Sequence, residues 1–225
     1  MIYYDTWHYL PESIDLSVPL KNRENTFKEL KKVVTILNDS LKTKYFFSCG
    51  TALGIIRDNK LIDWDVDIDI DLINPTDKEL EYLTNQMLKN DYKIYRQLKK
   101  NGRYIQLVFV KKPYHSIDFC IWYNHFDGYI NDIPETIYLK RVHSKSLYDE
   151  FKEIKFNNIN IQLPKNHIKY FETLYGRNWK KPKKYSFWIN NANDLRIDSN
   201  LFRVFFKILW KLKIVRKKIS LVETP

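Results

Sequence analysis

The sequence predicts an α+β domain, a mixed α/β chain built around one core. Segments with helical periodicity alternate with strand-like segments along the chain, without an internal repeat or a low-complexity linker. Large apolar side chains are abundant, with 16 Tyr and 13 Phe among 225 residues. This density excludes a disordered or collagen-like chain. The length suits one domain, expected over residues 1–200, followed by a basic segment at 201–225.

The apolar runs and the cysteines indicate the cellular compartment of the protein. The longest apolar runs are interrupted by charges and fall short of the roughly 20 residues that a membrane-spanning helix needs. The first residues do not show a basic start followed by an apolar stretch, so we expect no secretory signal. The two cysteines, Cys49 and Cys120, suit a reducing compartment better than a disulfide-stapled fold. We therefore expect a cytoplasmic protein.

The first elements of the predicted domain are a helix, a strand, a turn and a second helix. Apolar residues recur at helical spacing over residues 24–40, with lysines between them. The aromatic run at 44–49 predicts a buried strand that ends at Gly50. Residues 51–57 then predict a short helix that opens at this turn.

The turn at residues 48–51 is a candidate phosphate-binding site. Free backbone N–H groups and the helix dipole at such a strand-to-helix turn can hold a phosphate, and Gly50 would let the backbone approach it. Arg57 and Lys60 follow as candidate phosphate partners. The alternative is that the turn is a packing device and that the two basic side chains lie in solvent.

Residues 64–72, WDVDIDIDL, alternate strictly and predict a strand with an acidic face. Carboxylates two residues apart, such as Asp67 and Asp69, repel each other unless a cation neutralises them. Hard oxygen ligands favour Mg²⁺ or Mn²⁺, which typically carry substrate phosphates. The alternative is the solvated face of an edge strand. Because Asp is depleted in strands, the four alternating residues favour metal binding; they are Asp65, Asp67, Asp69 and Asp71.

The remaining elements are predicted from caps, turns and periodicity. Thr76 and Glu79 form a capping-box signature for a helix that runs to about Asn90. Pairs of residues at 101–102 and 157–158 predict hairpin turns. The pattern weakens between residues 128 and 146, where no order of elements is assigned. The predicted strands cover 92–98, 103–110, 115–123, 151–156 and 159–163, and a last helix covers 166–175 and ends at Gly176.

Two segments resemble the LicD/fukutin family. Residues 47–70, FSCGTALGIIRDNKLIDWDVDIDI, are similar to its glycine turn, arginine and acidic run, and residues 163–182, LPKNHIKYFETLYGRNWKKP, are similar to its closing motif. With a central strand at Ile117-Asp118-Phe119, the likeness covers about residues 25–185. The resemblance implies a nucleotidyltransferase-like fold with a mixed central β-sheet flanked by helices. It also implies transfer of a phospho-alcohol, such as phosphocholine or ribitol phosphate, from a CDP-activated donor to a glycan hydroxyl.

The resemblance also implies roles for individual residues. Asp67, Asp69 and Asp118 would be the catalytic metal ligands for Mg²⁺ or Mn²⁺, and Asp65 would be a neighbour that binds or orients. Asp118 would either complete the metal site or accept the proton of the acceptor hydroxyl. A strand-end aspartate without such a role is the alternative for Asp118.

The glycine-turn motif supplies the implied donor site, in which Gly50, Thr51 and Arg57 would hold the diphosphate. The chain departs from the family pattern at three places. Asp63 stands where proline is common, Ala52 replaces leucine, and Val66 stands where many relatives carry aspartate. Since Val66 would point to the opposite face of the strand, we expect the metal site to be spared.

Seven basic residues and one acidic residue occupy positions 201–225. A helix over 202–219 would be amphipathic and suited to an anionic membrane surface near a lipid-linked glycan acceptor, or it would dock on its own core. Two rival functions stay open, a nucleotidyltransferase acting on a sugar, protein or RNA, and a non-catalytic basic module. The sequence carries no recognisable nucleic-acid motif, so we do not expect a nucleic-acid partner.

Overall fold

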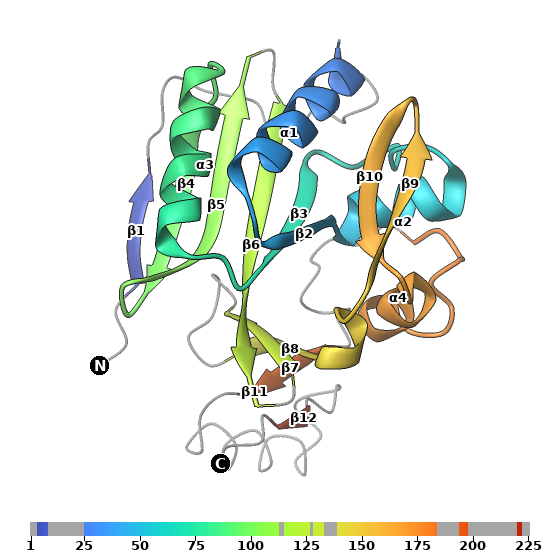
Figure 1. Cartoon of the computed structure of the whole chain (residues 1–225). Coiled ribbons are helices and arrows are strands. Elements are labelled where there is room, and N and C mark those ends of the chain that lie inside the picture. Colours follow the sequence, from blue (N-terminus) through green and yellow to red (C-terminus); the bar gives the residue numbers. More distant parts are fainter. Residues whose placement is uncertain are drawn as a thin grey trace.

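A mixed β-sheet runs through the molecule, and the remaining elements are arranged around it (Figure 1). The computed structural model describes residues 4–8, 25–112, 115–126, 128–132, 139–183, 194–197 and 220–221. The predicted helix at 202–219 lies outside these residues. Within the predicted basic segment, Ser220 and Leu221 form a short strand against residues 196–197.

The central strand β6 (His115–His125) divides the sheet into two branches. Along its first part β6 pairs with β5 on one side and, in parallel, with β3 on the other. Along its last part β6 pairs with β7. The other strands of the sheet are β1 (Tyr4–His8), β2 (Lys44–Phe47), β3 (Ile68–Ile73), β4 (Lys93–Lys100), β5 (Arg103–Lys111), β7 (Gly128–Asp132), β8 (Leu139–Ser144), β11 (Leu195–Ile197) and β12 (Ser220–Leu221).

Helices α1 (Thr26–Ser40) and α3 (Asp77–Lys89) lie side by side over the sheet (Figure 1). Helix α2 (Cys49–Asp58) packs on β3. The hairpin of β9 (Phe151–Phe156) and β10 (Ile159–Pro164) stands beside β2, where it contacts α1, and helix α4 (His167–Tyr175) packs on it. A short 3-10 helix, η2 (Lys145–Leu147), precedes the hairpin and contacts α4.

Glu79 holds α3 and the chain before β2 together. The predicted capping box is confirmed, because the side chain of Thr76 accepts from the Glu79 N–H and Glu79 Oε2 accepts from the Thr76 N–H at 2.9 Å. The other carboxylate oxygen of Glu79 accepts from the backbone N–H groups of Lys42 and Thr43 at 2.9 and 2.8 Å. One side chain therefore caps the helix and anchors the entry to β2.

The two predicted hairpin turns are confirmed by their backbone conformations. Asn101 and Gly102 have φ values of 51° and 77°, and Asn157 and Asn158 have φ values of 47° and 62°. Two consecutive residues with positive φ match the right-handed twist of the flanking strands. Asparagine and glycine adopt this region at low cost.

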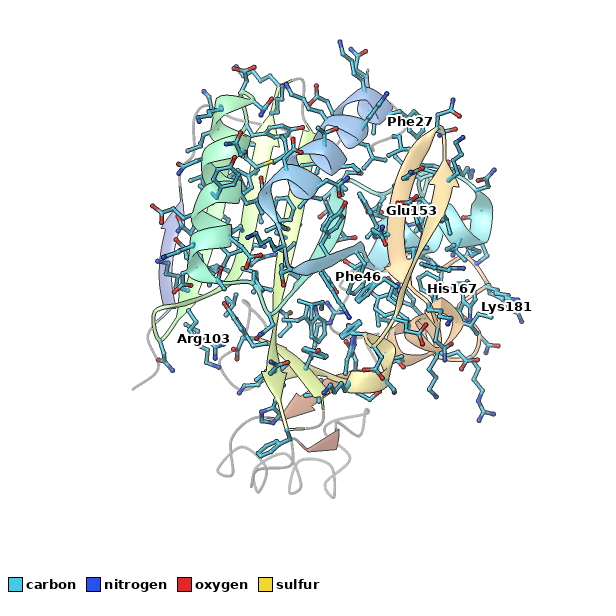
Figure 2. The ribbon with its side chains drawn as sticks, viewed as in Figure 1. Phe27, Phe46, Arg103, Glu153, His167 and Lys181 are labelled. Carbon is cyan, nitrogen blue, oxygen red and sulfur yellow. The ribbon has the colours of Figure 1, made fainter. Side chains whose placement is uncertain are left out.

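The core continues from the sheet into the hairpin and α4 through Phe46, which lies inside the molecule in Figure 2. Phe46 is fully buried, and its ring centroid lies 5.1 to 5.6 Å from the rings of Tyr148, Phe151 and Tyr170. These contacts join three segments that are far apart in the chain. The β9–β10 hairpin and α4 therefore share one core with the sheet.

Two predictions about the acidic run were wrong. The acidic strand was expected over 64–72, but β3 begins only at Ile68, because Asp65 N–H closes a turn on the carbonyl of Ile62 and the pairing with β6 starts at Ile68. Val66 accordingly lies in the loop and not on the opposite face of a strand. The stretch without assigned order contains β7 and β8, which extend the sheet beyond β6.

Candidate functional site

The site is built where two parallel strands bring carboxylates together. Asp69 on β3 pairs in register with Asp118 on β6. Side chains in register on neighbouring strands share a face of the sheet, so these two carboxylates lie next to each other. They are 49 positions apart in the sequence, and the parallel pairing of β3 with β6 brings them together.

Asp65 and Asp67 reach the same place from the loop before β3. Each of Asp65, Asp67 and Asp69 offers one carboxylate oxygen, and these oxygens lie within 4.8 Å of one another. We call these three residues the acidic cluster. All three side chains are half-buried. The ligand set expected from the sequence was Asp67, Asp69 and Asp118, whereas the structure groups Asp65 with the first two and places Asp118 beside them.

The turn between β2 and α2 holds Asp69 by its backbone and by its side chain. The Gly50 N–H donates to Asp69 Oδ2 at 3.0 Å, and the Asp69 N–H donates to Thr51 Oγ1 at 2.9 Å. The Ser48 N–H donates to the Asp69 carbonyl at 3.0 Å. The predicted donor-binding residues Gly50 and Thr51 therefore lie at the acidic cluster, where they position one of its members.

Gly50 also leaves room for Asp65. A Cβ atom at position 50 would lie 2.5 Å from Asp65 Oδ2, which is closer than real Cβ contacts allow. Only glycine lets the carboxylate of Asp65 approach this turn. The requirement at Gly50 is therefore steric.

Burial and mutual repulsion disfavour negative charge in the acidic cluster. The pKa of Asp69 lies well above its ordinary value, because burial disfavours the charged form and because Asp67, Asp65 and Asp118 add repulsion. A divalent cation would remove this penalty, and an all-carboxylate donor set fits a hard ion such as Mg²⁺ or Mn²⁺. The residues present therefore fit a divalent metal site.

Asp118 is held by Gln106 on the neighbouring strand β5. The Gln106 Nε2 donates to both carboxylate oxygens of Asp118, at 2.8 and 2.7 Å. Burial and the nearby Asp67 raise the pKa of Asp118 to about 7, against the opposing effect of the Gln106 hydrogen bond. A carboxylate with this pKa changes protonation near neutral pH, which suits a general base.

Asp71, the fourth residue of the alternating run, is placed differently from the acidic cluster. It is fully buried and accepts a hydrogen bond from Ser48 Oγ at 2.9 Å. Burial raises its pKa to about 6. Asp71 therefore supports the turn through Ser48, and it is more deeply buried than the three residues of the acidic cluster.

Arg57, the third predicted donor-binding residue, lies on the last turn of α2. Its guanidinium donates to both oxygens of Asp58, with a shortest distance of 2.6 Å, and its side chain is 7% exposed. Thr51 and Arg57 are six residues apart, or about 9 Å along the helix. The structure therefore separates Arg57 from the turn and pairs it with its neighbour.

Sequence reasoning missed three residues that support the site. Gln106 holds Asp118, and Tyr170 Oη accepts from the Cys49 N–H at 3.1 Å. Arg141 donates to Cys49 Sγ at 3.8 Å. For Gln106 a signal was present, since it is the one uncharged polar residue with an amide in the otherwise apolar run 105–110. No local pattern marks the other two.

The chain matches a known protein family. The family model described as LicD/FKTN/FKRP, nucleotidyltransferase domain, matches residues 42–166. This range contains the acidic cluster, the glycine turn and Asp118. No curated protein sequence matches the chain.

Two solved structures are similar at low sequence identity. One is the lincosamide antibiotic adenylyltransferase LnuA bound to lincomycin, with 17% identity, a TM-score of 0.43, and coverage of 62% of this chain and 80% of that chain. The other is an antigenic nucleotidyltransferase-like protein from Paracoccidioides brasiliensis, with 14% identity, a TM-score of 0.38, and coverage of 90% and 97%.

The mixed sheet, the glycine turn and the carboxylates at the β3–β6 pair define a transferase domain of the nucleotidyltransferase type. The chain belongs to the LicD/FKTN/FKRP family. The expected family and the expected fold class, a mixed central sheet flanked by helices, are thereby confirmed. Among the described residues, no helix is long and apolar enough to cross a membrane.

Proposed function

We propose that the protein is a Mg²⁺-dependent phosphotransferase of the LicD type. It would move a phospho-alcohol from a CDP-activated donor to a hydroxyl of a cell-surface or lipid-linked glycan. The observation that carries the proposal is the acidic cluster with Asp118 in register beside Asp69. Three carboxylates suited to a divalent ion and a fourth with a pKa of about 7 are the groups that such a transfer needs.

Each residue of the site has a role in the proposed reaction. Asp65, Asp67 and Asp69 would hold the metal, which when bound supplies positive charge for the donor diphosphate and for the charge that develops during transfer. Gly50 and Thr51 keep Asp69 in place, and the donor diphosphate would bind beside the turn that carries them. Arg57 would contact the donor only after leaving Asp58, so we assign it a secondary role.

Asp118 would act on the acceptor. It would take the proton of the acceptor hydroxyl as that oxygen forms its bond to the transferred phosphorus. The bond between this phosphorus and the bridging oxygen breaks, and CMP leaves with that oxygen. Gln106 orients Asp118 for this step through its two hydrogen bonds.

The proposal is tested by calorimetric titration of CDP with and without Mg²⁺. We expect metal-dependent binding by the wild type and its loss in Asp67→Asn/Asp69→Asn. Asp63→Asn is the matched control, because it removes an exposed carboxylate in the same loop that pairs with Lys60. Loss of binding in this control as well would point to a general effect of charge.

Product analysis then separates the proposed reaction from its rivals. Release of CMP from a CDP-alcohol supports the phosphotransferase, and release of pyrophosphate from a nucleoside triphosphate supports a nucleotidyltransferase. If no nucleotide binds, the chain shares only its fold with the family. Membrane attachment through residues 201–225 is a separate proposal, tested by sedimentation of the protein with anionic vesicles.

A further inference from the structure

A buried group of polar residues lies behind the turn that holds Asp69. Asp194 Oδ2 accepts from Arg141 Nε at 2.7 Å and contacts His143 Nε2 at 2.8 Å. The other ring nitrogen of His143 contacts the hydroxyl of Tyr148. Arg141 is 5% exposed, and His143 and Asp194 are each 1% exposed. We call Arg141, His143 and Asp194 the buried support.

The buried support is assembled from distant parts of the chain. Arg141 and His143 lie on β8, and Asp194 immediately precedes β11, which pairs antiparallel with β8. The Val142 N–H donates to the Asp194 carbonyl at 3.1 Å, which fixes Asp194 at this position. Residue 194 lies beyond the region 42–166 that matches the family. A segment outside the matched region therefore contributes a buried charge behind the site.

Arg141 connects the buried support to the acidic cluster. Its Nη2 donates to Cys49 Sγ at 3.8 Å, and Cys49 is the first residue of α2. Cys49 has a φ of 43°, a left-handed conformation that costs free energy for a residue other than glycine. The next residue, Gly50, donates its N–H to Asp69 Oδ2. A shift of Arg141 would therefore reach Asp69 through only two residues.

The position of this charge is not explained by stability alone. Taking an arginine and an aspartate out of water is expensive, and apolar residues of similar volume often stabilise a core equally well. The charge of Arg141 favours the ionised form of the buried Asp71, and its Nη2 contacts Cys49, the strained residue that opens α2. Groups that hold metal ligands in place commonly change metal affinity 10- to 100-fold when they are removed.

We propose that Arg141 and Asp194 are positioning residues for the acidic cluster, acting through Cys49 and Gly50. The chain as far as residue 194 is then part of the catalytic domain. This inference rests on the metal-dependent function proposed above. It concerns the geometry of the turn, so it is measured without a donor or an acceptor.

The first experiment measures Mn²⁺ affinity of the full chain well below its melting temperature. We expect Arg141→Met to weaken Mn²⁺ binding about tenfold. Asp194→Asn retains the shape of the side chain and should weaken binding less, in the same direction. The matched control is Lys111→Met, which breaks a half-buried ion pair with Glu29 on α1. Val108 on β5 pairs with Asp118, so Val108 and Val110 share the face of the sheet on which Asp118 lies. Lys111 follows Val110 on β5 and therefore lies on the opposite face.

The second experiment measures hydrogen exchange of residues 48–52 without metal. We expect faster exchange in Arg141→Met than in Lys111→Met, because the Gly50 N–H then loses its fixed partner. Wild-type Mn²⁺ affinity and unchanged exchange in folded Arg141→Met and Asp194→Asn would overturn the inference. Equal losses in all three variants would also overturn it, since a general loss of stability would explain them. A wild type that binds Mn²⁺ but transfers nothing from CDP-alcohols would overturn the proposed function alone.

Discussion

Asp69 and Asp118 stand in register on the parallel strands β3 and β6, and each is held by a different neighbour. Asp69 accepts from the Gly50 N–H, and Asp118 accepts from Gln106 Nε2. Among the described residues, the pairing of β3 with β6 is the only parallel strand pairing in the branch formed by β1 to β6. It joins the two carboxylates that the proposed reaction uses most directly.

Metal affinity should depend on pH because of Asp118. Its pKa of about 7 lies above the ordinary value of about 4, so the folded metal-free protein keeps a proton that the unfolded chain has lost. The stabilisation from this group is fully present below about pH 4 and is lost as the pH rises through 7. Asp118 lies beside the three metal-holding carboxylates, so a bound cation favours its ionised form and Mn²⁺ affinity should be weaker at pH 6 than at pH 8. Titration of Mn²⁺ at several pH values checks this, and an identical profile for Asp118→Asn would contradict it.

Gln106→Met should move this pH dependence upward. The Gln106 amide favours the ionised form of Asp118, so its removal leaves only the charge of Arg96 to oppose burial and repulsion, and the pKa of Asp118 rises further. The midpoint of Mn²⁺ affinity against pH should shift to a higher value. Gln97→Met is the control, because Gln97 on β4 donates to the hydroxyl of Tyr104 and not to Asp118. A shared shift in both variants would show that the hydrogen bond to Asp118 is not the cause.

Gly50→Ala should weaken metal binding without a matching loss of stability. The added Cβ would lie 2.5 Å from Asp65 Oδ2, so the carboxylate of Asp65 must shift from its place in the acidic cluster. We expect about tenfold weaker Mn²⁺ binding. Gly102→Ala provides the contrast, because position 102 has open space but a φ of +77°. That variant should lose about 1 kcal/mol of folding free energy and keep its Mn²⁺ affinity. Equal Mn²⁺ affinity in the two variants would refute the steric role of Gly50.

Glu79→Ala should destabilise the fold more than an ordinary helix cap. Burial raises the pKa of Glu79, but hydrogen bonds from Thr76, Thr43 and Lys42 outweigh it and hold the pKa below its usual value. Thr76→Ala should cost about 1 kcal/mol, and Glu79→Ala about 2 kcal/mol, because it also releases the chain before β2. Urea unfolding measures both values. Glu81→Ala, at an exposed position of α3, should change the free energy of unfolding by less than about 0.5 kcal/mol.

The local elements of this protein follow from short-range patterns that the sequence displays. The capping box at Thr76 and Glu79, the helix at 24–40 and the turn at Asn101-Gly102 depend on neighbouring residues only, so periodicity and turn chemistry predict them. The signature around Gly50 and Asp67 was sufficient to identify the family. The alternating run was predicted as one strand because an extended loop and a strand share the same pattern of side chains.

Tertiary structure decided where each carboxylate of that run lies. A turn closes between Ile62 and Asp65, and the pairing of β3 with β6 begins only at Ile68. Asp65 and Asp67 therefore lie in the loop before β3. The same pairing buries Asp71 and sets Asp69 beside Asp118. The partners of Arg141 lie 92 and 53 positions away, and such contacts arise only when distant strands meet. The sequence by itself thus determined the chemistry of the site, while the packing of the sheet determined which groups act together, because burial and repulsion depend on neighbours in space.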